Sequence, residues 1–306
     1  MLHNKLVGMG VALVTPFKTD GSVDFEALGK LVDFQIANDT NYLVVCGTTS
    51  EVPTLTQAER EEITRFVVER VAGKIPIVAG IGGYNTARIV RRVSSADFRG
   101  IDAVLSIVPY YSKPSQEGIY QHFKAIATAT EMPIILYNVP GRTGTNMTAS
   151  TTLRLAYEFK NIVAIKEASG NFQQIDEIIK NKPQSFMVIS GDDGITFPLI
   201  TLGAVGVISV IGNAFPREFS RMVRLALRGD LVGAREIHYR FTELMELLFV
   251  DGNPAGVKSM LSEMGMIENV LRLPLVPTTV ATKEKIRKVL SKIDKLVSYL
   301  QTSTNL

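Results

Sequence analysis

Short apolar runs rich in β-branched residues recur along the chain and alternate with longer amphipathic stretches. The runs cover residues 10–16, 42–47, 75–81, 102–109, 133–138, 162–168, 185–191 and 205–212. Continuous apolar runs of this length are typical of strands that are buried on both faces of a parallel sheet. Their spacing of about 30 residues is that of repeated strand–helix units. The pattern therefore predicts an α/β fold.

Eight such units favour a closed (β/α)8 TIM barrel over an open doubly wound sheet. No GxGxxG follows the first run, as a dinucleotide-binding sheet would require. Beyond Gly229 the apolar runs stop, and helical patterns follow over residues 231–249, 254–264 and 282–300. We therefore predict a barrel over residues 1–230 that carries the active site, and a C-terminal all-helical domain over residues 231–306.

Local signals mark the ends of individual helices. Residues 56–73 are typical of a helix with a capping box formed by Thr56 and Glu59 and with Gly73 as its C-cap. Asp192 and Asp193 in "GDDG" fit cap and turn residues better than a carboxylate pair for a metal.

Composition narrows the possible functions. The chain has 306 residues, of which 46% are hydrophobic and 21% charged, as in a globular protein. A net charge of +3 is spread along the chain, so neither nucleic-acid nor membrane binding is indicated. The single Cys46 excludes an internal disulfide, and His3, His122 and His238 lack metal-binding spacing. Since no apolar run approaches the roughly 20 residues that span a bilayer, we expect a cytoplasmic protein.

The sixth apolar run contains a lysine near its end, Lys166, that a buried strand does not explain. Because side chains alternate along a strand, Ala164 and Lys166 share one face, and Val163 and Ile165 take the other. With helices covering the second face, Lys166 points into the barrel mouth, where TIM-barrel active sites lie. A buried ammonium is costly unless it is paired or neutral, so Lys166 is a candidate nucleophile.

Neighbouring strand ends bring further groups to the same mouth. Tyr137 is the last residue but one of the fifth run, and adjacent strands lie about 4.8 Å apart, so its phenol can meet the amine of Lys166. On the second run, Val44, Cys46 and Thr48 share a face, which delivers the Thr48 hydroxyl to the mouth.

This set of groups suits carbonyl chemistry. A neutral lysine amine attacks a carbonyl to form a Schiff base, whose protonated imine is an electron sink, and a neighbouring phenol acts as acid and base. The hydroxyl and amide of Thr49 and the guanidinium of Arg142 suit carboxylates. No metal or organic cofactor is required, since the lysine itself is the electron sink. The alternative is a surface lysine without a catalytic role, paired with Glu167.

Six motifs occur in the order and spacing of a known family. They are "GTTSE", "PYYSKPSQEGIYQHF", "LYNVPGRTG", "IKEASGN", "SGDD" and "GVISV". Almost the whole chain, from the first strand to "LRLPLVPTT", resembles the 4-hydroxy-tetrahydrodipicolinate (dihydrodipicolinate) synthases of the N-acetylneuraminate lyase superfamily of class I aldolases. The resemblance implies a lyase that condenses pyruvate with L-aspartate 4-semialdehyde, giving 4-hydroxy-tetrahydrodipicolinate in the diaminopimelate route to L-lysine.

The resemblance also implies catalytic roles and an assembly. Lys166 would form the pyruvate Schiff base, and Tyr137 would transfer protons through a relay with Thr48 and Tyr111. Tyr111 would reach across a tight dimer interface into the neighbouring active site. The implied assembly is a homotetramer built as a dimer of dimers.

Substrate-binding roles follow from the same resemblance. Thr49 would hold the pyruvate carboxylate and Arg142 the semialdehyde carboxylate, while Gly191 and the Ile208 carbonyl would line the pocket. Ser50 departs from the family, which usually has glycine at this position beside the carboxylate-binding turn.

A second departure concerns regulation. Lysine-inhibited members of the family bind L-lysine in a cleft at the dimer interface. The matching positions here carry Gln57, Arg60, Tyr84, Arg88 and Tyr110, and only the tyrosine at position 110 agrees with those members. Arg88 puts a positive charge where a glutamate would hold an ammonium. We therefore expect weak or absent inhibition by L-lysine.

Two other functions stay open at this point. A pyruvate-dependent aldolase of the neuraminate lyase type would use the same imine with a sugar-derived aldehyde, although Arg142 favours an aldehyde that carries its own carboxylate. A catalytically silent barrel that binds an oxo acid as a sensor would not require Lys166, Tyr137, Thr48 and Tyr111 together.

Overall fold

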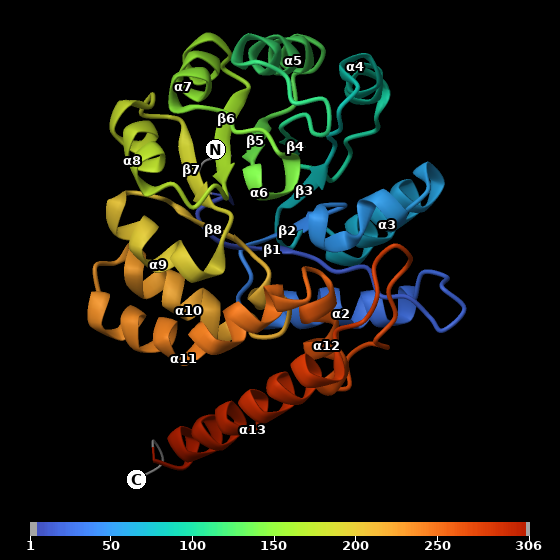
Figure 1. Cartoon of the computed structure of the whole chain (residues 1–306), viewed down its shortest axis with the longest axis vertical. Coiled ribbons are helices and arrows are strands. Elements are labelled where there is room, and N and C mark those ends of the chain that lie inside the picture. The colour runs from blue at the N-terminus through green and yellow to red at the C-terminus, as the bar shows by residue number, and fades with distance from the viewer. Residues whose placement is uncertain (1–4, 304–306) are drawn as a thin grey trace.

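Eight parallel strands close into a barrel in the computed structural model, which describes residues 5–303, with side chains described through residue 293. Each strand pairs with the next, and the last pairs with the first. The strands are β1 (Gly8–Ala12), β2 (Tyr42–Val45), β3 (Ile77–Gly80), β4 (Ala103–Ile107), β5 (Ile134–Asn138), β6 (Ile162–Glu167), β7 (Met187–Ser190) and β8 (Gly206–Ser209). The predicted (β/α)8 barrel is confirmed (Figure 1).

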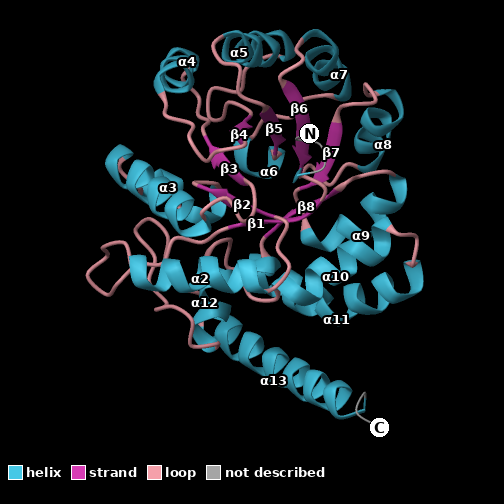
Figure 2. Ribbon diagram, turned by 180° about the vertical axis from the view of Figure 1, so that it is seen from behind, coloured by secondary structure: helices cyan, strands magenta, loops and turns pink. Residues whose placement is uncertain are grey.

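Helices surround the barrel, as Figure 2 shows from behind. They are α2 (Phe25–Ala37), α3 (Gln57–Val71), α4 (Thr86–Ser95), α5 (Gln116–Thr128), the short α6 (Pro140–Thr143), α7 (Ala149–Glu158), α8 (Phe172–Asn181), α9 (Asp193–Leu202) and α10 (Pro216–Leu227). Three 3-10 turns lie in the loops, namely η1 (Thr48–Ser50), η2 (Val52–Thr54) and η3 (Ile211–Asn213).

Three further helices form the predicted C-terminal extension. They are α11 (Leu231–Val250), α12 (Ala255–Glu263) and α13 (Val280–Ser303). Helix α11 packs against α9 and α10, and α12 and α13 pack against α11, so that α13 lies at the edge of the molecule in Figure 1. The domain boundary at residue 230 stays a prediction, and residues 304–306 lie outside the described residues. Within residues 5–303, no helix combines the length and apolarity needed to cross a bilayer.

Alternating strand residues build two apolar layers. The layer inside the barrel contains Ala12, Val44, Val78, Leu105, Ile135, Ala164, Ile189 and Ile208. The layer between strands and helices contains Val11, Leu43, Val45, Val104, Leu136, Ile165, Val188 and Val207. Each large aliphatic side chain buried in these layers contributes about 1.5–3 kcal/mol. Because the strands are buried on both faces, their sequences are continuous apolar runs.

The first strand differs from its prediction. It covers Gly8–Ala12 rather than residues 10–16, because the backbone leaves the sheet after Leu13. The amide of Val14 donates to the side chain of Asn213 at 3.1 Å. The hydroxyl of Thr15 donates to the carbonyl of Ser50 at 2.9 Å, which directs this loop toward η1.

The ends of α3 agree only in part with the sequence signals. The capping box of Thr56 and Glu59 is confirmed, since each accepts a hydrogen bond from the backbone of the other. The C-cap is Ala72, at φ 49°, and not Gly73. Gly73 follows at φ 74°, so the left-handed turn begins one residue earlier than predicted.

A bulge in β6 changes the predicted alternation. Ile134 pairs with Ile162 but Ile135 pairs with Ala164, so Val163 is an extra residue in the ladder. The prediction that Val163 faces the helices with Ile165 is therefore wrong for Val163, which packs against the layer inside the barrel. The prediction is right for Ile165.

Candidate active site

Lys166 and Tyr137 lie side by side at the carboxyl ends of β6 and β5. They are register partners in the parallel ladder, and the Lys166 Nζ lies 4.4 Å from the centre of the Tyr137 ring. Their exposed fractions are 5% and 6%. The predicted meeting of the two side chains inside the barrel mouth is confirmed.

The alternative pairing of Lys166 with Glu167 is not formed. Glu167 is fully buried and accepts hydrogen bonds from Ser169 N at 2.8 Å, from Asn138 Nδ2 at 3.2 Å and from Gln174 Nε2 at 3.3 Å. Burial raises the pKa of its carboxyl group, and these hydrogen bonds oppose the rise. Adjacent residues of a strand point to opposite faces, so the Glu167 carboxylate binds partners on the face opposite to Lys166. Lys166 therefore does not form the surface ion pair of the alternative interpretation.

Glycine at position 191 makes room for the lysine side chain. A methyl group there would lie 3.1 Å from Lys166 Cε and 2.7 Å from Ala168 Cβ. The Gly191 amide also donates to the carbonyl of Glu167 at 2.8 Å. Ile208, on β8, is buried in the layer inside the barrel. Gly191 and Ile208 therefore belong to the same interior as Lys166.

The chain turns sharply after β2. Cys46 has φ 54°, and its Sγ lies 3.7 Å from the Arg60 carbonyl and 3.6 Å from Thr64 Oγ1, both on α3. The prediction that Cys46 shares a face with Val44 and Thr48 is therefore wrong, because the left-handed backbone at Cys46 ends the alternation. Burial raises the pKa of this free thiol, which fits a small buried side chain rather than a nucleophile.

The turn η1 carries the two predicted threonines. Thr48 is half-buried and Thr49 is buried. The Ser50 hydroxyl donates to the Leu13 carbonyl at 2.7 Å, while the Ser50 carbonyl accepts from Thr15. Ser50 thus joins η1 to the loop after β1.

Asn253 connects two of the predicted site residues and has no counterpart among the sequence predictions. Its Nδ2 donates to Thr49 Oγ1 at 3.0 Å, and its carbonyl accepts from Arg142 Nη2 at 3.2 Å. Its Oδ1 is buried and has no partner among the described residues. Arg142 itself is exposed on α6. Nothing in the sequence around Asn253 indicates contacts with residues more than 100 positions away.

A buried ion pair joins the segment after η1 to helix α12. Glu51, at φ 58° between η1 and η2, pairs with Lys258 of α12, and both side chains are fully buried. The Lys258 Nζ also donates to the Val270 carbonyl at 2.9 Å and lies 4.1 Å from the centre of the Phe17 ring. Burial lowers the pKa of Lys258 to about 8, although Glu51 opposes the change.

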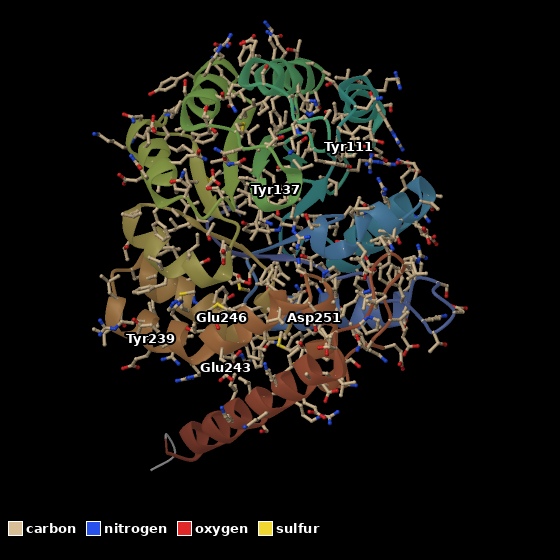
Figure 3. All side chains as sticks on the ribbon, in the orientation of Figure 1. Tyr111, Tyr137, Tyr239, Glu243, Glu246 and Asp251 are labelled. Carbon is tan, nitrogen blue, oxygen red and sulfur yellow. The ribbon has the colours of Figure 1, made fainter. Side chains whose placement is uncertain are left out.

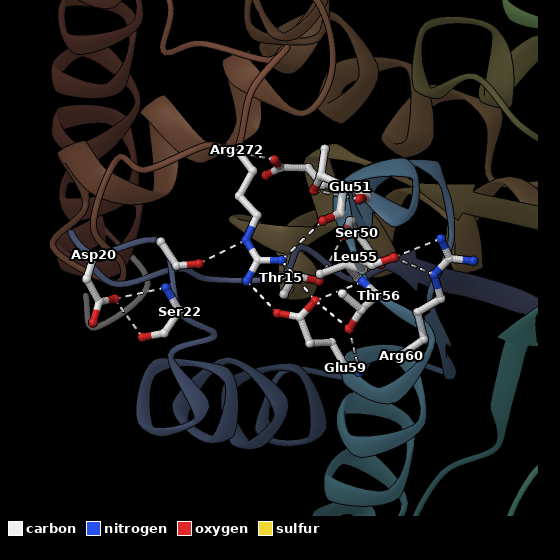
Figure 4. Close-up of polar contacts among 12 residues, drawn as sticks. Thr15, Asp20, Ser22, Ser50, Glu51, Leu55, Thr56, Glu59, Arg60 and Arg272 are labelled. Carbon is white, nitrogen blue, oxygen red and sulfur yellow. Dashed lines mark hydrogen bonds and ion pairs between the residues drawn. The ribbon is translucent and has the colours of Figure 1, made fainter.

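Arg272 extends this cluster to the start of α3, as Figure 4 shows. Its amide donates to Glu51 Oε2 at 3.1 Å, and its guanidinium pairs with Glu59. Hydrogen bonds from Arg272 lower the pKa of Glu59 to about 2. The C-terminal segment is thereby tied to the middle of the loop between β2 and α3 and to the first turn of α3.

Tyr111 lies apart from the other predicted residues of the relay. It is 92% exposed, at φ 71° in the loop between β4 and α5. Figure 3 shows it toward the edge of the barrel on the side of α4, whereas Tyr137 lies near the centre. Among the described residues, no hydrogen bond joins Tyr137 to Thr48 or to Tyr111. One chain therefore assembles the lysine and tyrosine at the mouth without Tyr111.

The two aspartates of "GDDG" have structural partners. Asp192 caps α9 by accepting from the Gly194 amide at 2.9 Å. Asp193 is buried and accepts from the amides of Val210 and Ile211, and burial raises its pKa to about 6. The interpretation as cap and turn residues is confirmed for Asp192 and wrong for Asp193, which is the first residue of α9 and binds the backbone at the start of η3. Over the described part of the chain, no group of three or more His, Cys, Asp or Glu side chains could hold a metal ion.

Comparison with known proteins agrees with this geometry. The model of the dihydrodipicolinate synthetase family matches residues 5–293. The chain belongs to this family. It is 70% identical over 293 residues to the 4-hydroxy-tetrahydrodipicolinate synthase of Parabacteroides distasonis, covering 96% of this chain and 99% of that protein. The synthase of Phocaeicola vulgatus is 66% identical with the same coverage.

Solved structures of the dihydrodipicolinate synthetase family have the same fold. The crystal structure of dihydrodipicolinate synthase from Aquifex aeolicus superimposes with a TM-score of 0.92 at 46% identity, covering 94% of this chain and 98% of that chain. The chain is thus an enzyme of this family, which acts as a synthase in the lysine and diaminopimelate route.

The Glu51–Lys258 ion pair gives a stability prediction for this family member. Lys258→Met leaves Glu51 buried without a counter-charge, so we expect a loss of about 3 kcal/mol in the free energy of unfolding, measured by urea denaturation. The double variant Glu51→Gln/Lys258→Met removes both charges and should be more stable than Lys258→Met alone.

The matched control is Lys30→Met, which breaks the exposed pair with Glu26 and should leave the urea midpoint unchanged. Equal losses in Lys258→Met and in the double variant would contradict a buried pair whose members depend on each other.

Proposed function

We propose that this enzyme condenses pyruvate with L-aspartate 4-semialdehyde through a Schiff base on Lys166. The observation that carries the proposal is a buried lysine without a carboxylate partner, packed against Tyr137 at the mouth of the barrel. The neutral Lys166 amine attacks the keto carbon of pyruvate, and water leaves to give the protonated imine. Loss of a proton from the methyl carbon gives an enamine, whose carbon attacks the aldehyde carbon of the semialdehyde.

Proton transfer in these steps is assigned to Tyr137. Its phenol lies beside the lysine, so it can protonate the carbinolamine hydroxyl that leaves as water and then accept the proton from the methyl carbon. Thr48 and a Tyr111 from a neighbouring copy would complete the relay. Support for the second copy comes from the exposure of Tyr111, which leaves this side chain free to enter another subunit. We propose a homotetramer built as a dimer of dimers.

The substrate carboxylates are assigned to the two residues that Asn253 connects. Thr49 would bind the pyruvate carboxylate, with Gly191 and the Ile208 carbonyl lining the pocket. Arg142, held at its Nη2 by the Asn253 carbonyl, would bind the carboxylate of the semialdehyde. Attack of the product's own amino group on the imine carbon would close the ring and release Lys166 as the free amine, giving 4-hydroxy-tetrahydrodipicolinate.

The substrate assignment is tested by turnover with two aldehydes. Wild-type enzyme should consume pyruvate with L-aspartate 4-semialdehyde and not with N-acetylmannosamine, the partner expected for a neuraminate-lyase-type aldolase. Arg142→Met should lower kcat/KM for the semialdehyde by roughly 100-fold, because a charge-assisted pair with the substrate is lost. The rate at which pyruvate alone forms the imine should stay unchanged.

The matched control is Arg154→Met, whose guanidinium pairs with Glu117 and Glu158 on the surface. It should behave as the wild type. Turnover with N-acetylmannosamine only, or full semialdehyde activity in Arg142→Met, would contradict the assignment.

We also propose that L-lysine inhibits this enzyme weakly or not at all. Arg88 is exposed on α4, and its fixed positive charge disfavours an ammonium beside it. Wild-type enzyme titrated with millimolar L-lysine should keep nearly all its activity at saturating pyruvate. Strong inhibition would show that another acidic group supplies the missing charge.

A further inference from the structure

Asn253 lies in the short link between α11 and α12 and contacts both residues that are assigned to the substrate carboxylates. Its side-chain Nδ2 donates to Thr49 Oγ1 at 3.0 Å, and its main-chain carbonyl accepts from Arg142 Nη2 at 3.2 Å. Only 7% of Asn253 is exposed. The side chain therefore acts at the pyruvate end of the proposed site and the main chain at the semialdehyde end, so the two contacts can be changed separately.

The contact with Asn253 determines where the Thr49 hydroxyl hydrogen can point. A hydroxyl group has one hydrogen to donate and two lone pairs that accept, whereas an amide nitrogen only donates. Asn253 Nδ2 therefore occupies a lone pair of Thr49 Oγ1 and leaves the hydroxyl hydrogen uncommitted. Within residues 5–293, no atom accepts this hydrogen, although Thr49 is buried. A buried donor without an acceptor in the protein fits an oxygen of the substrate.

The link that carries Asn253 is fixed on both sides. Asp251 accepts from the Thr279 amide at 2.8 Å and from the Thr279 hydroxyl at 3.1 Å. Lys258, on the helix that follows, forms the buried pair with Glu51. The Asn253 amide is thus held in place before the substrate binds, which is the condition for a side chain that orients another one.

Stability alone does not account for an asparagine at position 253. Its Oδ1 is buried and has no partner within the described residues. A buried acceptor without a hydrogen bond lowers stability, and an apolar side chain of similar size would avoid this cost. Among residues 5–293, the one hydrogen bond that the side chain forms is the bond to Thr49. The contact with Thr49 is therefore the feature that explains this residue.

We propose that Asn253 is a positioning residue for pyruvate, which directs the Thr49 hydroxyl hydrogen toward the pyruvate carboxylate. This inference rests on the role proposed above for Thr49. With its hydrogen uncommitted, Thr49 donates to the carboxylate without first breaking a bond to the protein. Substitutions of the Asn253 side chain leave the main-chain carbonyl that holds Arg142, so they should impair the use of pyruvate and not that of the semialdehyde.

Steady-state kinetics with both substrates tests this inference, together with borohydride trapping of pyruvate on Lys166. In the Schiff-base mechanism, kcat/KM for pyruvate reports the first half-reaction and kcat/KM for the semialdehyde the second. Asn253→Ala should lower kcat/KM for pyruvate by roughly tenfold, because the Thr49 hydroxyl is then free to rotate away from the carboxylate. The value for the semialdehyde and the urea midpoint should stay close to those of the wild type.

Asn253→Asp separates positioning from a structural role. Aspartate has nearly the same size and shape, so a structural role predicts a smaller loss of kcat/KM for pyruvate than in Asn253→Ala. Under the proposal the loss is larger, because the new carboxylate accepts the Thr49 hydrogen and repels the carboxylate of pyruvate. This variant also provides the comparison with the wild type if Asn253→Ala does not fold.

The double variant Asn253→Ala/Thr49→Val tests whether Asn253 acts through Thr49. It should lower kcat/KM for pyruvate no more than Thr49→Val alone, because the hydroxyl that Asn253 orients is already absent. The matched control is Asn181→Ala, an exposed asparagine at the end of α8 whose Nδ2 donates to the Glu177 carbonyl. It should behave as the wild type does.

The results that would overturn the inference are distinct from a failure of the proposed function. Absence of the Lys166 adduct in the wild type would remove the proposed function and this inference with it. With the adduct present, an unchanged kcat/KM for pyruvate in Asn253→Ala would reject the inference alone. So would a smaller loss in Asn253→Asp than in Asn253→Ala, which would make Thr49 the donor in this contact. Losses that add up in the double variant would show that Asn253 does not act through Thr49.

Discussion

The buried ion pair between Glu51 and Lys258 is the interaction on which the active-site mouth depends. It joins the loop after β2 to α12, two segments that are more than 200 residues apart in the sequence. The cost of burying two charges is offset only because each has further partners, the Arg272 amide for Glu51 and the Val270 carbonyl for Lys258. With this contact in place, the C-terminal segment can present Asn253 to Thr49.

The barrel determines how the Lys166 amine is placed among apolar side chains. Parallel pairing puts Lys166 next to Tyr137, and the bulge at Val163 sets the register that makes them partners. Glu167, next in sequence, points to the opposite face, where Asn138 and other polar groups bind it. Lys166 and Glu167 thus have separate surroundings, so that no ion pair with the adjacent carboxylate holds Lys166 as an ammonium.

Sequence patterns predict the part of this site that depends on local periodicity. Eight apolar runs predict the barrel, and strand alternation predicts that Tyr137 meets Lys166. The same rule fails for Val163 and Cys46, because a bulge and a left-handed residue end the alternation and neither has a sequence signal.

Contacts between segments that are distant in the sequence form the part of the site that the sequence does not predict. The hydrogen bonds of Asn253 join it to residues more than 100 positions away in the sequence, and polarity alone does not distinguish this asparagine from others in loops. The Glu51–Lys258 pair is equally long-range, and Lys258 occupies a helical pattern in which a lysine would ordinarily be exposed. Tyr111 is a third case, since its proposed partners lie in another copy of the chain.

The most direct measurement for the central claim is borohydride reduction of the enzyme in the presence of pyruvate, followed by mass spectrometry of its peptides. The account predicts a pyruvate-derived adduct on Lys166 in the wild type and none in Lys166→Arg, with circular dichroism showing that the variant is folded. An adduct on Lys258, the other lysine that is buried within residues 5–293, or no adduct at all would contradict Lys166 as the nucleophile.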